Sequence, residues 1–192
     1  MKFAVLSVMV IMLFLLNLFI GSVDIPARDV IDILLGDDTH GSAGFIVTGS
    51  RLPMAVTALL AGAGLAVSGL MLQTSFRNPL AGPSILGITS GASLGVALVL
   101  LFFGGSVAIG TLTIGGYAAV ILGAFVGSML MMGVLLGLST LLRNDLMLLI
   151  TGIMMGYLAS SLIMLLNYAS TAEGVQNYVM WGMSSFNGVS LQ

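Results

Sequence analysis

The sequence predicts an all-α membrane protein, a polytopic bundle of transmembrane helices, and three features of its composition predict this class. Hydrophobic residues fill 58% of the 192 positions and charged residues 6%, against about 25% charged residues in a soluble domain. The mean hydropathy is +1.18, so the few charges cannot cover the surface of a soluble fold of this length. Glycine occurs 26 times, which is typical of helices that pack closely in lipid.

The first span is predicted at residues 3–20, directly after Lys2. A transmembrane helix needs about 20 apolar residues. The apolar core of a cleaved signal peptide has only about 7–15 residues, followed by small residues at the cleavage site. The longer run found here favours an uncleaved span over a signal peptide.

Residues 21–51 form a polar segment that we expect outside the membrane. It holds the only histidine, His40, and several aspartates: Asp24, Asp29, Asp32, Asp37 and Asp38. Within it, Pro26 precedes the stretch ARDVIDILLG, in which Val30, Ile33 and Leu34 recur at helical spacing. This pattern predicts a short amphipathic helix at the membrane interface, because the stretch is too short to cross a bilayer.

Four further apolar stretches follow, and we predict spans at residues 53–73, 84–103, 107–142 and 146–167, with the tail 168–192 outside. The stretch 107–142 is long for one span and barely enough for two. Basic residues prefer cytoplasmic loops. With Lys2 and the N-terminus in the cytoplasm, Arg77 lies inside, and Arg143 joins it if 107–142 is one span with an external lead-in. This arrangement gives five spans. It also places Arg28 and Arg51 outside, against the preference of basic residues, so their external position needs another explanation.

Small residues recur at four-residue spacing along four of the predicted spans, which places each set on one helix face. The sets are Gly87, Gly91 and Gly95; Gly152, Gly156 and Ser160; Gly123 and Gly127, then Gly133 and Gly137; and Ala58, Gly62 and Ala66. Small faces let helix backbones approach closely in lipid. Dense packing within the chain is favoured over a dedicated dimer face, and a path for a bulky solute stays open as a third use.

The predicted spans contain no Asp, Glu, Lys, Arg or His, which argues against a transporter that couples to protons through its own membrane residues. Sodium coordination by backbone carbonyls stays open. Cysteine is absent, which excludes thiol catalysis, thiolate metal sites and disulfides among these residues. Serines within the spans lack a base and no basic patch suggests nucleic acid, so an enzyme is not expected. A pump of this kind takes its energy from a separate subunit, which indicates a permease.

A long, ordered pattern runs from Arg51 to Gly95, RLPMAVTALLAGAGLAVSGLMLQTSFRNPLAGPSILGITSGASLG. It resembles the FecCD/BtuC family, the membrane subunits of type II ABC importers for ferric siderophores, haem and cobalamin. The segment VMWGMSSFNGVS at residues 179–190 is similar to the Trp-Gly segment of that family. The signature residues that carry the resemblance are Arg77, Asn78, Pro79, Leu80, Pro83, Gly87, Gly91, Trp181 and Gly182.

The resemblance implies a BtuC-like permease fold in the bacterial cytoplasmic (inner) membrane. Two permease subunits, either two copies of this chain or this chain with a homologous permease, enclose a central path. A cytoplasmic ABC ATPase dimer binds ATP and supplies the energy, so no cofactor is expected in this chain. A periplasmic or lipid-anchored substrate-binding protein docks on the outside, and no nucleic acid takes part.

The resemblance also implies roles for individual residues. The span 146–167 lines the path in relatives, which here singles out Thr151, Gly152, Met155, Gly156 and Ser160. The turn before it, at Asn144 and Asp145, falls where relatives place a cytoplasmic gate. Arg51 corresponds to arginines that pair with acidic residues of the binding protein, and a snorkelling interfacial arginine is the alternative. Relatives often carry a second arginine where this chain has Met54.

Family members continue well beyond 192 residues, and their contacts with the ATPase lie in that later half. We therefore expect the chain to be an N-terminal portion of the family fold, without the C-terminal half, and inactive alone. Two other functions stay open. One is a secondary transporter driven by an ion gradient, with the five spans as one half of an inverted repeat. The other is an assembly fragment that binds its complementary half without transporting a solute.

Overall fold

The computed structural model describes residues 2–36, 41–109, 112–142, 144–183 and 186, and it divides into two compact units, residues 1–66 and 67–184. Among the described residues, four helices are long and apolar enough to cross a membrane. They begin at Lys2, Gly41, Gly116 and Leu146 and end at Phe19, Ser75, Ser139 and Ala169. The chain is therefore a polytopic helical membrane protein, as its composition predicts.

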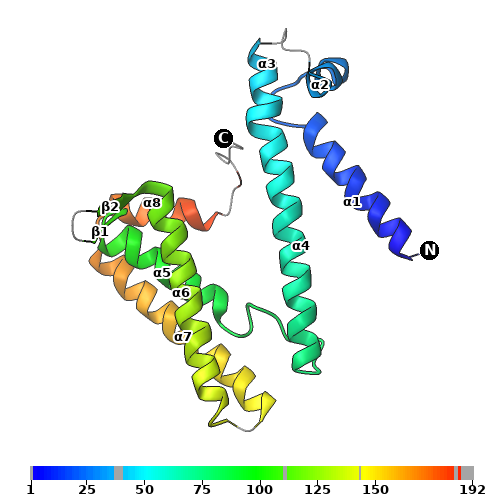
Figure 1. Cartoon of the computed structure of the whole chain (residues 1–192). Helices are drawn as coiled ribbons and strands as arrows, with labels where there is room; N and C mark the ends of the chain where they lie inside the picture. The colour runs from blue at the N-terminus through cyan, green and yellow to red at the C-terminus, as the bar shows by residue number, and fades with distance from the viewer. Residues whose placement is uncertain (1, 37–40, 110–111, 143, 184–185, 187–192) are drawn as a thin grey trace. The chain divides into compact units, whose positions relative to one another are not determined.

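The first unit consists of helices and a π-helical turn (Figure 1). Its elements are α1 (Lys2–Phe19), α2 (Ala27–Leu34), α3 (Gly41–Ile46), the π-helical turn η2 (Val47–Arg51) and the first part of α4 (Leu52–Ser75). The elements α3, η2 and α4 run on as one continuous helix. Residues 41–51, expected to belong to a polar external segment, are therefore helical.

The amphipathic helix predicted after Pro26 is α2, with Pro26 at its N-cap. Val30 and Ile33 are buried and pack against Val47 of η2. Leu34, which the pattern placed on the same apolar face, is 40% exposed. Burial of each large aliphatic side chain contributes about 1.5–3 kcal/mol, so the Val30–Ile33–Val47 cluster holds α2 against η2.

The second unit is built around α5 (Ile88–Ala97), which continues in the π-helical turn η3 (Leu98–Phe102). The other elements are the hairpin β1 (Ser106–Ile109) and β2 (Leu112–Gly115), then α6 (Gly116–Ser139), α7 (Asp145–Ala169) and α8 (Ala172–Gly182). Helix α5 packs against both α6 and α7 (Figure 1). The core lies where the turn before α5 meets these two helices, and its buried residues are Ala81, Leu86, Leu135 and Leu149.

The third predicted span is shorter than expected. Residues 84–87 belong to a turn, in which the Gly87 amide donates to the Ser84 carbonyl over 3.2 Å. Helix α5 begins at Ile88 and has 10 residues, and η3 adds 5. The described chain thus has four helices of full span length instead of the predicted five. The apolar pattern missed this because Ser84 to Gly87 is as apolar as the helix that follows.

The expectation of a purely helical chain misses the β1–β2 hairpin. The two strands are antiparallel, with Ser106 opposite Gly115 and Ile109 opposite Leu112. Gly104 (φ 64°) and Gly105 (φ 85°) let the chain leave η3 in a conformation that other residues rarely adopt. The valine, isoleucine and threonine of this stretch favour strands, although their hydropathy also suits a membrane helix. Only one long helix, α6, lies within 107–142, as the single-span interpretation requires.

Candidate functional site

The signature segment 77–87 ends α4 with a Schellman turn. The Asn78 amide donates to the Gln73 carbonyl over 3.1 Å, and the Arg77 amide donates to the Thr74 carbonyl over 3.3 Å. Arg77 has φ 45°, the only positive φ of a residue other than glycine in the described chain. This is the left-handed position that usually carries glycine after a helix. Arg77 therefore sets the direction in which the chain leaves α4.

The next residues of the signature segment form a second turn. The Asn78 side-chain oxygen accepts a hydrogen bond of 2.9 Å from the Leu80 amide, and the Asn78 carbonyl accepts one of 3.1 Å from Ala81. Leu80 is 75% exposed, whereas Ala81 is 2% exposed and belongs to the core. Pro79 lies at the centre of this turn and has no amide to donate. The segment is a structural connection between α4 and α5.

The signature segment ends at Gly87, which lies directly against α7. Gly87 has φ 72°, and a Cβ at this position would lie 2.7 Å from the carbonyl oxygen of Gly152. A Cβ at Gly152 would in turn lie 2.9 Å from the Cα of Leu86. Because backbone meets backbone here, both positions require glycine.

A second seam of glycines joins α5 to α6. A Cβ at Gly91 would lie 2.6 Å from the Cβ of Met131 and 2.7 Å from the carbonyl oxygen of Gly127. Gly95 and Gly123 meet in the same way one turn further along. Close packing within the chain, predicted for these sets, is confirmed. Of the other predicted faces, a Cβ at Gly62, Gly133 or Gly137 would meet no atom within 4 Å other than those of its chain neighbours and its own helix backbone.

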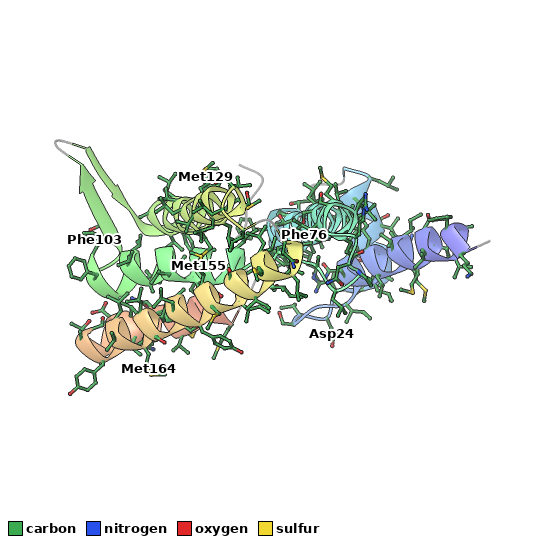
Figure 2. All side chains as sticks on the ribbon, turned by 90° about the horizontal axis from the view of Figure 1, so that it is seen from below. Asp24, Phe76, Phe103, Met129, Met155 and Met164 are labelled. Atoms are coloured by element: carbon green, nitrogen blue, oxygen red, sulfur yellow. The ribbon has the colours of Figure 1, made fainter. Side chains whose placement is uncertain are left out.

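The residues proposed to line a path fall into two groups on α7. Gly152, Met155 and Gly156 face inward. Gly152 is buried against Leu86 in the turn before α5, and Met155 packs on the core cluster. A Cβ at Gly156 would lie 3.2 Å from the hydroxyl oxygen of Ser90 on α5. Figure 2 shows Met155 turned inward and Met164 turned outward on the same helix. The hydroxyls of Thr151 and Ser160 donate to the carbonyls of Met147 and Gly156 over 2.8 and 2.9 Å. Their role in a path stays a prediction.

The two residues proposed as a gate lie at the start of α7. The side-chain oxygen of Asn144 accepts a hydrogen bond of 2.9 Å from the Leu146 amide, so Asn144 is the N-cap of this helix. Asp145 is the first helical residue, and its side chain lies outside the described part of the chain. The cap gives Asn144 a structural role, and a gating role for either residue stays a prediction.

Arg51 lies inside the first unit and is 6% exposed. Its Nη1 donates to the carbonyls of Leu18 and Phe19 over 3.0 and 3.2 Å, and Nη2 donates to the carbonyl of Val23. Leu18 and Phe19 end α1, where helix carbonyls lack helical partners and a cation is favourable. A carboxylate of a binding protein could reach this guanidinium only if the end of α1 moved. Docking through Arg51 stays a prediction, and the contacts of its guanidinium in this structure are internal.

Trp181, the aromatic residue of the second signature, lies on α8. Its ring stacks on Tyr178 with the centroids 6.0 Å apart and the planes 29° apart. Trp181 is 38% exposed, whereas Tyr178 is half-buried. Burial raises the pKa of the Tyr178 hydroxyl above its usual value of 10.0, so this hydroxyl stays neutral. Gly182 is the last residue of α8.

Two concave surfaces of the second unit were not predicted from the sequence. An apolar groove of about 530 Å³ runs between α6 and α7 over the glycines of α5. A smaller recess of about 290 Å³ is lined by Ile163 and by five residues with hydroxyl groups: Thr89, Ser90, Ser93, Ser160 and Tyr178. The spacing of Thr89, Ser90 and Ser93 is visible in the sequence, but their meeting with α7 and α8 is not. Within the described residues, no group of three His, Asp or Glu side chains could hold a metal ion.

Comparison with known proteins shows the family. The model of the FecCD transport family matches residues 9–192. The molybdate import system permease protein MolB of Haemophilus influenzae is 42% identical over 137 residues, which are 71% of this chain and 38% of that protein. The vitamin B12 import system permease protein BtuC of Escherichia coli O127:H6 is 32% identical over 184 residues, which are 96% of this chain and 52% of that protein.

A solved structure has the same fold. It shows an inward-facing conformation of a metal-chelate type ABC transporter, with a TM-score of 0.71 and 28% sequence identity. The match covers 97% of this chain and 54% of that chain. The chain thus spans about half, or less, of the length of these relatives. With four helices of span length, the signature turns and this match over nearly all its residues, the chain belongs to the FecCD transport family.

Proposed function

We propose that the chain forms part of the membrane permease of an ABC importer that carries an iron–siderophore complex, haem or cobalamin. The family match over residues 9–192 is the observation that carries this proposal. Relatives named for molybdate, vitamin B12 and Fe(3+)-citrate import support a bulky or oxyanionic solute. A separate cytoplasmic ATPase dimer binds ATP, because no charged residue of the predicted spans could couple transport to protons.

The proposed topology has five crossings, with the N-terminus in the cytoplasm. Helix α5 with η3 is the short one, about 22 Å long at 1.5 Å per residue. If it crosses, the connections before α5 and before α7 both lie in the cytoplasm, so Arg77 and Arg143 join Lys2 there, as the preference of basic residues requires. If it does not cross, Arg143 lies on the opposite side from Arg77. The charge pattern therefore supports α5 as a fifth crossing.

The solute path is proposed to follow α7, with Thr151, Gly152, Met155, Gly156 and Ser160 on its lining and with Asn144 and Asp145 at its cytoplasmic end. In the described structure, Gly152 lies against the turn before α5 and Gly156 lies against α5 itself. Their proposed contribution is therefore to bring α5 to the edge of the path. A second permease subunit, identical or homologous, completes the path, and a periplasmic or lipid-anchored binding protein delivers the solute.

The experiment is an uptake assay in proteoliposomes. The gene product that contains these 192 residues is reconstituted with its ATPase and its binding protein. We expect uptake that requires ATP and disappears when the ATPase cannot hydrolyse it. Uptake driven by an ion gradient without ATP would instead establish a secondary transporter. The same assay with residues 1–192 alone tests the assembly-fragment function, for which no uptake is expected under either condition.

A further inference from the structure

Five hydroxyl groups from three separate elements meet at the smaller recess of the second unit. Thr89, Ser90 and Ser93 come from α5, Ser160 from α7 and Tyr178 from α8. We refer to these five residues as the hydroxyl recess. Ser160 lies nine residues before Ala169, the last residue of α7. At 1.5 Å per residue this is about 14 Å along the helix axis, well inside a hydrocarbon core of about 30 Å.

Polar groups at this depth are usually satisfied by the chain itself. Elsewhere in the unit, hydroxyls donate to carbonyls one turn back along their own helices, as in Ser128, Ser139, Thr140, Thr151 and Ser161. In the hydroxyl recess only Ser160 does so, through its bond of 2.9 Å to Gly156. Within the described part of the chain, the hydroxyls of Thr89, Ser90, Ser93 and Tyr178 have no hydrogen-bond partner. Hydroxyl groups left without partners in hydrocarbon cost about 4–8 kcal/mol each, so these surfaces do not face lipid chains.

The recess has the volume and the chemistry for water and for part of a polar solute. Its volume of about 290 Å³ holds several water molecules. Four hydroxyls are free to donate, while Ser160 has used its proton and can only accept. Burial raises the pKa of the Tyr178 hydroxyl, so this group also keeps its proton. The recess is therefore an uncharged surface rich in donors.

We propose that the hydroxyl recess is a hydrated contact site within the membrane for solutes that carry many acceptor oxygens, such as the carboxylates and carbonyls of a metal chelate. For the nature of the solute, this inference rests on the proposed function. Neutral donors bind such oxygens through hydrogen bonds alone, without the stronger attraction of a fixed positive charge. A path conducts only if its sites bind strongly enough to admit a solute and weakly enough to release it. The four free hydroxyls of the recess can donate to such oxygens and, without the charge of an arginine or a lysine, can also release them.

The first experiment tests hydration by cysteine accessibility, because these residues contain no cysteine. Ser90→Cys, Ser93→Cys and Ser160→Cys are introduced singly into the gene product that contains this chain, with any cysteine outside residues 1–192 replaced by serine. The reagent is an anionic, membrane-impermeant methanethiosulfonate, which reacts with thiolates in water. Leu165→Cys is the matched control, because Leu165 lies about 140° around α7 from Ser160, is 65% exposed and lines neither concave surface.

We expect the three recess thiols to react at least tenfold faster than the thiol of Leu165→Cys. Equal rates at all four positions would overturn the hydration of the recess. Serine to cysteine is nearly isosteric, and three positions are tested, so one poorly folded variant does not decide the result. If labelling is fast but uptake does not need ATP, the proposed function fails and the recess stands. If uptake needs ATP but the recess thiols are as slow as the control, the recess fails alone.

The second experiment tests the class of solute by protection. Labelling of Ser93→Cys is measured with ferric citrate, which presents carboxylate oxygens, and with tetraethylammonium, which has no acceptor. We expect millimolar ferric citrate to slow labelling severalfold and tetraethylammonium to leave it unchanged. Equal protection by both compounds, or by neither, would overturn the preference for acceptor oxygens.

Discussion

Arg77 ends α4 in a left-handed backbone conformation, in which the Cβ of the residue lies too close to its own backbone. Left-handed φ costs an L-residue about 1–2 kcal/mol, and glycine avoids this strain. We expect Arg77→Gly to raise the stability of the purified protein in detergent by about 1 kcal/mol. Arg77→Val is expected to lower it, because a β-branched residue tolerates this φ worst. Thermal unfolding followed by tryptophan fluorescence measures both, and a valine variant as stable as the parent would contradict the argument.

Arg51 is the one strongly buried charged residue of the described chain, and it joins α1 to η2. Removal of its guanidinium leaves the carbonyls of Leu18, Phe19 and Val23 without these donors. We expect Arg51→Met to destabilise the first unit by about 1.5–3 kcal/mol, since hydrogen bonds to charged groups contribute that much. Hydrogen exchange of residues 18–26 is the measurement, and faster exchange is expected.

Two controls separate the internal role of Arg51 from docking. Arg28→Met removes an exposed arginine of the same unit and is expected to leave the exchange unchanged. Arg51→Lys keeps the charge but loses the fork that bonds several carbonyls at once. If the lysine variant exchanges like the parent yet binds the binding protein more weakly, the docking role is supported instead.

At the scale of elements, the seam between α5 and α6 leaves no room for a side chain. We expect Gly91→Ala to destabilise the protein by about 1–3 kcal/mol, because its Cβ would meet Met131 and Gly127 and force the helices apart. Gly133→Ala is the matched control on α6, since nothing lies within 4 Å of its Cβ. This control is expected to be neutral or more stable by up to about 1 kcal/mol through helix propensity. Thermal unfolding of the two variants side by side checks the difference.

Helix α8 carries a pH dependence through Tyr178. Its folded-state pKa lies above the usual value of 10.0 because burial disfavours the phenolate. The unfolded chain therefore loses this proton first, and the stability conferred by the neutral hydroxyl is complete below pH 10.0 and is lost as the pH rises beyond it. We expect Tyr178→Phe to remove part of the alkaline loss of stability. Unfolding temperatures on either side of pH 10 for the two proteins measure it, and identical alkaline slopes would contradict the prediction.

The sequence predicts the elements that have a strong hydrophobic or small-residue periodicity. It misses the features that depend on contacts between segments distant in the sequence. Helix α2 follows from Val30 and Ile33 at helical spacing, and the glycine seam follows from Gly91 and Gly95. The β1–β2 hairpin does not, because its apolar residues suit strand and membrane helix equally. The bonds of Arg51 could not be predicted either, since they depend on how residues 18–23 return to η2. The same holds for the hydroxyl recess, whose members come from three elements.

At the scale of the whole molecule, the five-crossing topology places the chain before α5 and the chain after η3 on opposite sides of the membrane. Cysteines at Leu80 and Leu141 are expected to react with an impermeant reagent from the cytoplasmic side, and a cysteine at Tyr117 from the external side. All three positions are highly exposed in the described structure. If Leu80→Cys and Tyr117→Cys react from the same side, α5 does not cross, and the number of crossings is four. Labelling of right-side-out and inverted vesicles decides between these outcomes.

The contact of Gly91 with Gly127 also limits how this protein can be repaired by mutation. In most cores, a larger residue on one helix can be balanced by a smaller one on its neighbour. Here both positions already hold the smallest residue. Met131→Gly would remove one of the two contacts of a Gly91 side chain, but the other contact is with the backbone carbonyl of Gly127, which no substitution can make smaller. A selection for second-site suppressors of Gly91→Ala should therefore return only changes that move the helices themselves, away from the seam. A substitution in this seam can thus be undone by reversion to glycine, but not by a compensating substitution at the facing position.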